Sequence, residues 1–263
     1  MLASEARCRG TTGRLVKSWG NRASSRDASI LHSAQRIIAD VLGDFAPDVW
    51  EGAKFSAGAS TSLPRRKGDP VNKYRKKLDC TPACLRHTLA LIRVTPLWLA
   101  ELTSRFGDNP LDWVNVVVGN RIETVPKTSE IDRVIAIEPE ANMMLQLALG
   151  SAIRERLRAV GIDLNNQSTN RKLAQLGSLD GSLATLDLSS ASDSVSIGLV
   201  WRLLPDSWYK ALCLCRSPAG VLPNGDVIKW EKFSSMGNGY TFVRKGCLAE
   251  RIENQRLKFE GVT

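Results

Sequence analysis

Leu183-Ala-Thr-Leu-Asp-Leu-Ser-Ser-Ala-Ser-Asp-Ser194 is the stretch that decides the fold. Its apolar first half, Leu183 to Leu188, predicts a short buried strand, and the polar second half predicts a helix that begins near Asp193. Asp187 then lies at the carboxyl end of a strand, where open α/β sheets place ligands and where a carboxylate suits magnesium. Taken alone, the stretch is better explained by a helix capping box of Ser190 and Asp193, with Asp187 as an ordinary loop carboxylate.

Composition limits the classes of function. The chain has 263 residues, enough for one or two domains, and 43% of them are hydrophobic, enough for a sizeable core. A net charge of +9 favours a polyanionic partner, with nucleic acid first and an anionic membrane surface second. No apolar run approaches the ~18 residues that a membrane span needs, so we expect no membrane-spanning segment.

The six cysteines predict no metal centre. The only cluster with metal-like spacing is Cys80, Cys84 and His87, and no fourth ligand follows at the usual spacing. We therefore reject zinc and expect the reduced thiols of a cytosolic protein.

Residue periodicity and turn signals predict a helix-rich chain. Helices are expected over 29–44, 81–93, 96–106, 139–160, 165–176, 193–204 and 205–214, a strand over 112–118, and a hairpin over 221–230 that turns at Asn224-Gly225. The buried stripe of the long helix is predicted to comprise Leu149, Ile153, Leu157 and Val160, with Gly161 ending the helix. Residues 1–29 are rich in Arg, Ser and Gly, which is typical of a transit peptide or of a disordered basic leader; we expect a disordered leader outside the fold.

The stretch around Asp187 has two companions. Val125 to Val134 lies upstream with basic residues, and Ser234-Ser-Met-Gly-Asn-Gly-Tyr-Thr-Phe242 lies downstream. Along the chain, a segment with basic residues comes first, then an aspartate at a strand end, and then a Ser/Gly/Asn loop. This is the order of polymerase motifs F, A and B.

The amino-acid sequence of these and other segments resembles that of the RNA-directed RNA polymerase (replicase) of the leviviruses, the single-stranded RNA bacteriophages. The matching phrases, spread from about Ile30 to Phe242, are Phe55 to Thr61, Ile135-Ala-Ile-Glu-Pro139, Arg156-Leu-Arg158, Gly161-Ile-Asp-Leu-Asn165, Asp187 to Ser194, Arg216-Ser-Pro218 and Ser234 to Phe242. The resemblance implies an α+β, helix-rich, right-hand polymerase fold with fingers and an incomplete palm. It divides the chain into a leader (1–29), fingers (30–180), a partial palm with motifs A and B (181–242) and an unmatched tail (243–263).

The resemblance also implies roles for residues of motifs A and F. Asp187 and the backbone carbonyl of Leu188 are the expected ligands of Mg²⁺, and two such ions clamp the attacking and leaving oxygens of nucleotide transfer. Lys127 and Arg133 match the basic pair of motif F. Fixed cations there orient the triphosphate and stabilise the leaving pyrophosphate. Without the resemblance, both would be ordinary exposed charges on a strand.

Motif B completes the expected nucleotide site. Asp193 and Asn238 match the pair that recognises the ribose 2′-hydroxyl, which a deoxyribose would leave without a partner. Ser235 and Gly237 let the backbone approach the nascent base pair.

Residues 65–77 carry seven basic side chains against one acid, Asp69. A solvated loop is the ordinary explanation. Given the resemblance, we favour a finger loop that binds template phosphates, with one aromatic ring able to stack on a base. The expected RNA-binding residues are Arg65, Arg66, Lys67, Lys73, Tyr74, Arg75, Lys76 and Lys77.

The expected partners are those of the family: template and product RNA, ribonucleoside triphosphates, and host elongation factors Tu and Ts with a ribosomal protein, in the cytoplasm of the bacterial host. The departure from the family is the Gly-Asp-Asp turn, which is absent, since no aspartate follows Asp226. We therefore expect an inactive fragment, and a frameshift or a premature stop in the gene is one explanation. The alternative is a non-catalytic basic RNA-binding protein; a reverse transcriptase would show Tyr-x-Asp-Asp, which is also absent.

Overall fold

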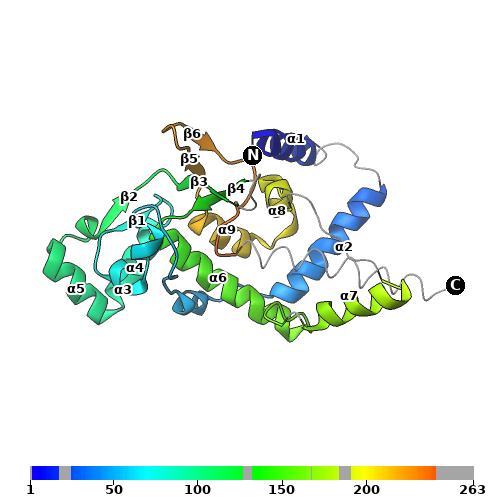
Figure 1. The fold of residues 1–263 in the computed structure, drawn as a ribbon, viewed down its shortest axis with the longest axis horizontal. Helices are drawn as coiled ribbons and strands as arrows, with labels where there is room; N and C mark the ends of the chain where they lie inside the picture. Colours follow the sequence, from blue (N-terminus) through cyan, green and yellow to red (C-terminus); the bar gives the residue numbers. More distant parts are fainter. Residues whose placement is uncertain (1, 18–24, 127–131, 167, 184–190, 241–263) are drawn as a thin grey trace.

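The computed structural model describes residues 2–17, 25–126, 132–166, 168–183 and 191–240 (Figure 1). In this part of the chain, helices dominate and the strands form two small sheets, which confirms the α+β class. No helix of the described residues is long and apolar enough to cross a membrane.

Helix α6 (Glu140–Ala159) is the central element of the core. Leu145, Leu149, Ile153 and Leu157 recur every four residues and are buried, so one stripe of the helix packs against its neighbours. Those neighbours are the 3-10 turn η1 (Pro47–Gly52), α2 (Ser25–Leu42), β1 (Leu78–Cys80) and α9 (Asp206–Cys215). The stripe ends at Leu157: Val160, predicted to be buried, is 48% exposed because the helix has already ended at Ala159.

The larger sheet has the strand order β4-β3-β5-β6. Strands β3 (Asn120–Pro126) and β4 (Asp132–Ile137) pair antiparallel, β5 (Ala219–Val221) runs parallel to β3, and β6 (Val227–Lys229) pairs antiparallel with β5. The predicted Asn-Gly turn joins the last two strands, with Gly225 at φ +88. Ile122, Ala136 and Trp230 form a small second core on this sheet.

The short elements of the amino-terminal half gather at one end of the molecule (Figure 1). They are η2 (Arg65–Lys67), α3 (Pro70–Tyr74), β1, α4 (Leu85–Arg93), α5 (Pro96–Phe106), η3 (Pro110–Trp113) and β2 (Val114–Val116), which pairs parallel with β1. Helix α5 has the predicted bounds. Helix α4 begins four residues later than predicted, at Leu85; residues 81–84 instead form a turn in which the Cys84 N–H donates to the Thr81 carbonyl at 3.0 Å.

The prediction of a disordered leader is wrong for residues 2–17. They form α1 (Leu2–Lys17), which packs on α8 (Ile197–Leu203). Glu5 and Cys8 are buried, and the Glu5 carboxylate accepts the backbone N–H groups of Glu231 and Lys232 at 2.6 and 3.1 Å. The partners that order this polar helix lie some 190–230 residues away, so its own composition could not reveal them.

The segment after α6 departs from prediction in detail. Helix α7 spans Ser168–Asp180, and α8 begins at Ile197 rather than near Asp193, because Ser196 caps it by accepting from the Leu199 N–H at 3.2 Å. Asp193 instead lies on the 3-10 turn η4 (Ser192–Ser194). The predicted strand at 183–188 falls, apart from Leu183, outside the described residues.

Candidate functional site

The Ser/Gly/Asn segment 234–240, here called the B loop, lies between strand β4 and helix α6. The backbone N–H of Ala136 donates to the carbonyl of Met236 at 2.8 Å, and the Gly239 N–H donates to the Gln146 side chain at 3.0 Å. Gly150 of α6 also approaches the Gly239 carbonyl closely, so a side chain at either glycine would collide with its neighbour. The loop is thus fixed to the predicted motif F hairpin on one side and to the central helix on the other.

Gly237 is the most constrained position of the B loop. Its φ is +114, and a Cβ there would overlap the Ala136 carbonyl. We expect Gly237→Ala to lower the free energy of unfolding by about 2–4 kcal/mol, through backbone strain and the lost fit to β4. Gly225→Ala is the matched control: its φ is also positive, but nothing lies within 4 Å of the added Cβ, so about 1 kcal/mol is expected. Equal losses in thermal denaturation would contradict the proposed fit.

Ser235 and Asn238 of the B loop are buried, 5% and 3% exposed. The Asn238 N–H donates to the Ser235 carbonyl at 3.2 Å, and the Asn238 side-chain oxygen accepts the Tyr240 N–H at 3.1 Å. Both residues line a crevice that also includes Lys232 and Glu138. Two of the four residues expected at the nucleotide, Ser235 and Asn238, therefore lie together among buried polar side chains.

Asp193 is connected to this crevice through Lys232. The ammonium of Lys232 lies 2.8 Å from the Asp193 carboxylate and 3.7 Å from that of Glu5, and it stacks over the Trp230 ring at 4.7 Å. Lys232 is almost fully buried, so its charge is compensated by two acids and an indole. Sequence analysis missed Lys232 because no motif marks it; only its place two residues before the B loop could have drawn attention.

Arg133 lies exposed on β4, opposite Val125 of β3. Arg133 lies on the same strand as Ala136, whose backbone N–H binds the B loop, three residues nearer the hairpin tip. Its expected partner Lys127 lies outside the described residues, as do Asp187 and Leu188. Within the ranges that the structure does describe, no group of three or more His, Cys, Asp or Glu side chains is placed to hold a metal ion.

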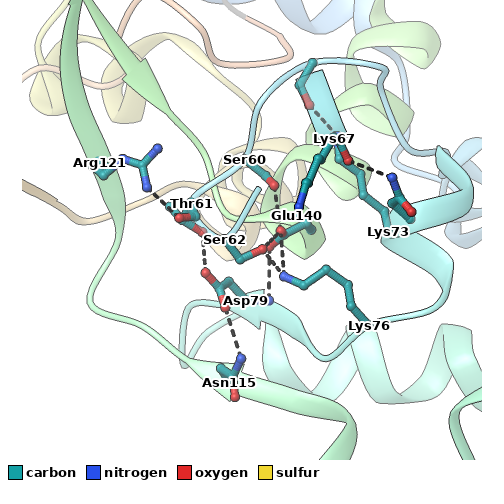
Figure 2. A network of polar contacts seen from close by, with 12 residues as sticks. Ser60, Thr61, Ser62, Lys67, Lys73, Lys76, Asp79, Asn115, Arg121 and Glu140 are labelled. Carbon is teal, nitrogen blue, oxygen red and sulfur yellow. Dashed lines mark hydrogen bonds and ion pairs between the residues drawn. The ribbon is translucent and has the colours of Figure 1, made fainter. Parts of the chain in front are cut away.

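The basic segment 65–77 divides into an internal and an exposed part (Figure 2). Lys73 is 2% exposed, and its ammonium donates to the carbonyls of Ser56 and Gly58 at 2.6 and 2.8 Å. Burial lowers the pKa of this ammonium. Lys73 therefore holds the chain together instead of facing solvent, and it leaves our set of RNA-binding residues. Lys76 is half-buried and lies 3.2 Å from the buried carboxylate of Glu140.

The other members of the segment lie at the surface. Arg65, Arg66 and Lys67 form the exposed 3-10 turn η2. Arg75 pairs with Glu101 at 3.5 Å, and Lys77 with Asp112 at 3.9 Å, both at partly exposed positions where an ion pair contributes little. The Tyr74 ring packs edge-on against Phe55 and Trp98 and is 38% exposed, so only part of its surface remains for a base.

Glu138 is a buried carboxylate in the floor of the crevice. It is 2% exposed and accepts from Ser217 Oγ at 2.5 Å and from Asn120 Nδ2 at 3.1 Å. Desolvation raises the pKa of Glu138 above its ordinary value, although these hydrogen bonds oppose the shift. Sequence analysis quoted this residue within a matching phrase but gave it no role; a lone acid after an apolar strand was the available signal.

The raised pKa of Glu138 predicts how stability depends on pH. The folded state favours the protonated acid, so this contribution is complete below the unfolded pKa of about 4.5 and is lost as pH rises through the higher folded value. We expect Glu138→Gln to be more stable than the parent at pH 7, with the advantage shrinking toward pH 4. Glu155→Gln, on the exposed side of α6, should leave the profile unchanged. Parallel curves of melting temperature against pH for Glu138→Gln and the parent would refute this.

Cys80 and Cys84, the cysteines of the segment with metal-like spacing, lie in the hydrophobic core. Cys80 and Cys84 are buried, and burial raises the pKa of Cys80 to about 11 and that of Cys84 further still. His87 stacks near Trp50, with ring centroids 5.7 Å apart. Burial of the two thiols accounts for the raised pKa values, and both cysteines pack as core residues.

Comparison with known proteins identifies the family. The sequence model of the family described as "RNA replicase, beta-chain" matches residues 1–246. The chain belongs to this family. The RNA-directed RNA polymerase subunit beta of Enterobacteria phage SP is 45% identical over 256 residues, and that of Escherichia virus Qbeta is 44% identical over 247 residues. The RNA-directed RNA polymerase beta chain of Escherichia phage MS2 is 41% identical over 223 residues.

The match covers most of this replicase beta-chain family member but less than half of each relative. The aligned part is 95% of this chain and 42% of the phage SP protein, 92% and 40% for Qbeta, and 84% and 40% for MS2. The match to the family also begins at residue 1, whereas we had expected it to begin near Ile30. Helix α1 thus belongs to the replicase beta-chain sequence as well as to its fold.

Proposed function

We propose that this replicase beta-chain segment positions template and nucleotide in an RNA-directed RNA polymerase, as the fingers and the first part of the palm of a right-hand fold. One observation supports this above the others: the Ala136–Met236 hydrogen bond joins the β3–β4 hairpin to the B loop across 100 residues of sequence. The elements that match motifs F and B therefore lie side by side, as a nucleotide bound between them requires.

In this proposal each part of the site has a distinct task. Arg133, with Lys127, provides fixed positive charge for the triphosphate, and a preorganised cation needs no rearrangement as charge develops on the leaving pyrophosphate. Asp193 and Asn238 recognise the ribose, with Lys232 fixing the Asp193 carboxylate. Ser235 and Gly237 form the surface against which the new base pair lies.

Magnesium enters the proposal only through residues outside the described ranges. Asp187 and the Leu188 carbonyl are the proposed ligands, and the bound ions would activate the attacking oxygen and neutralise the leaving group. Among the described side chains no cluster fits such an ion, and the Asp193 carboxylate is already paired with Lys232. We therefore assign Asp193 to ribose recognition and not to the metal.

The exposed turn η2 supplies the proposed contact with RNA. Three consecutive cations, Arg65, Arg66 and Lys67, lie at the surface on a structured turn and can pair with successive phosphates. Arg75 and Lys77, later in the same basic segment, are further proposed contacts. By its resemblance to the leviviral enzymes, the protein would act in the cytoplasm of the bacterial host on viral RNA and ribonucleoside triphosphates, with elongation factors Tu and Ts and a ribosomal protein as possible host partners.

A second function is favoured by the sequence itself. Because the 263 residues contain no Gly-Asp-Asp turn, the chain by itself would be a basic RNA-binding protein without catalysis. The two functions share one requirement, the binding of RNA.

That requirement gives the first test. We expect the purified chain to bind single-stranded RNA, with log affinity falling linearly as log salt concentration rises, because each phosphate contact releases counterions. For about five contacts the slope would be roughly −3.5 on a single strand. Filter binding between 50 and 300 mM salt measures it. Absence of binding at low salt, or an affinity independent of salt, would refute both functions.

A further inference from the structure

The buried carboxylate of Glu140 joins three segments of the chain: residues 60–62, residues 76–79 and the first turn of α6 (Figure 2). Glu140 is the first residue of α6 and is 1% exposed. Its carboxylate accepts from the hydroxyls of Ser60, at 2.6 Å, and Ser62, from the Lys76 ammonium at 3.2 Å, and from the Asp79 backbone N–H at 3.1 Å. A buried carboxylate is costly unless such donors surround it, so these four contacts fix one another's positions.

A second carboxylate continues the same network. Asp79 is 7% exposed and accepts from the Thr61 hydroxyl at 2.6 Å and from Asn115 at 3.3 Å. The backbone of Thr61 is bound as well: its N–H donates to the Glu138 carbonyl at 3.2 Å, and its carbonyl accepts from Arg121 at 2.7 Å. Residues 60–62 are therefore held by side chains and backbone together.

The 60–62 turn is followed in the chain by the exposed cations of η2, Arg65–Lys67. Ser60 and Leu63 exchange two backbone hydrogen bonds, and Pro64 then begins η2. On the far side of η2, Gly68 packs so closely on the Gly58 carbonyl that no side chain would fit. The Arg65–Lys67 turn is thus clamped at both ends, and Glu140 lies at the base of one clamp.

We propose that Glu140 is a positioning residue for RNA: its carboxylate holds the 60–62 turn and Lys76 so that Arg65, Arg66 and Lys67 are presented to phosphates in one fixed geometry. The inference rests on the proposed function, since it concerns the same RNA contact. Glu140 itself touches no RNA in this scheme.

The proposal and simple electrostatics predict opposite effects of Glu140→Gln on RNA affinity. Glu140→Gln removes a negative charge from a protein that binds a polyanion, so electrostatics alone predicts tighter RNA binding. Positioning predicts the opposite. Gln is uncharged and has one acceptor oxygen, so it forms no ion pair with the Lys76 ammonium and cannot accept both from the Ser60, Ser62 and Lys76 donors and from the Asp79 N–H, which weakens the anchor of the 60–62 turn.

The experiment measures single-stranded RNA affinity and its salt slope for the parent chain, Glu140→Gln and Glu155→Gln, after circular dichroism has established that each is folded. Glu155 lies on the exposed side of the same helix and loses the same charge. We expect about tenfold weaker binding and a shallower salt slope for Glu140→Gln, and unchanged or tighter binding for Glu155→Gln. Ser62→Ala, which alters no charge, covers the case in which Glu140→Gln does not fold; it should weaken binding in the same direction.

A double-mutant cycle separates positioning from general loss of stability. In a background where Arg65, Arg66 and Lys67 are Ala, Glu140→Gln should cause no further loss, because the cations that it positions are gone. Hydrogen exchange gives a readout without RNA: amides of residues 58–68 should lose protection in Glu140→Gln while those of β3 keep it.

Two outcomes overturn the inference in distinguishable ways. If the parent binds RNA and Glu140→Gln binds as tightly or more tightly, or if its loss persists undiminished in the triple-Ala background, positioning is refuted and the proposed function stands. If the parent shows no salt-dependent binding, the proposed function fails and the inference fails with it.

Discussion

Primer extension by the 263-residue chain alone is expected to give no ribonucleotide incorporation above that of its Asp187→Asn variant. Two magnesium ions at short separation repel each other, so both bind only where several anionic ligands converge. Asp187 offers one carboxylate, no aspartate follows Asp226, and the described residues contain no further cluster of acids. A site without most of its metal ligands loses several kcal/mol of transition-state stabilisation. Because each ~1.4 kcal/mol changes the rate tenfold, the rate should fall by several powers of ten.

The assay uses labelled ribonucleotides, magnesium and a primed RNA template. The polymerase of a relative such as phage SP serves as the positive control, and Asp226→Asn, in an exposed hairpin turn, is a matched charge control. Incorporation by the parent and by Asp226→Asn, but not by Asp187→Asn, would disprove the prediction. It would show that other carboxylates complete the metal site; Glu250 and Glu253 are the first acids that follow the B loop in the sequence.

Replacing Arg65, Arg66 and Lys67 together by Ala is expected to weaken single-stranded RNA binding by up to about a hundredfold at 0.1 M salt, and to reduce the salt slope by about 2. The structure selects these three because η2 is exposed, whereas Lys73 is buried and Lys76 is paired with Glu140. Three phosphate contacts on a single strand account for both numbers if each cation releases its share of counterions.

A second triple variant controls for net charge. Arg86, Arg171 and Lys172 are exposed at other places on the surface, and replacing them by Ala removes the same three charges. We expect an effect of threefold or less, since distant charges act only through a screened field. Similar losses in the two triple variants would mean that RNA is attracted by overall charge and not by the η2 turn.

Much of the helical framework could be predicted from local pattern. Helix α5 has the predicted bounds because Pro96 and Gly107 mark its two ends, and α6 was visible in the four-residue spacing of Leu149, Ile153 and Leu157. The Asn224-Gly225 hairpin followed from the positive φ that its turn demands. These signals lie within a few residues of the structure that they specify.

What could not be predicted depends on partners that are distant in sequence. Nothing near Lys73 indicates that carbonyls of Ser56 and Gly58 will bury its ammonium, and nothing near Glu140 indicates that two serines and a lysine will surround it. A run of basic residues looks uniform in sequence, but the fold makes some of its members internal and leaves others at the surface. The predicted motif A strand stays a prediction, since it falls outside the described residues.

Helix α1 has a consequence for the order in which the molecule can be made. Its partners are α8 and the backbone of Glu231 and Lys232, up to 227 residues further along the chain. At ribosomal rates of roughly 5–20 residues per second, about 10–45 s separate the synthesis of Glu5 from that of Glu231 and Lys232, whose N–H groups donate to its carboxylate. An isolated 16-residue helix is marginal in water, so the first segment to leave the ribosome stays without a docking surface until nearly everything else described here exists. The docking of α1 therefore follows the synthesis of α8 and of residues 231–232.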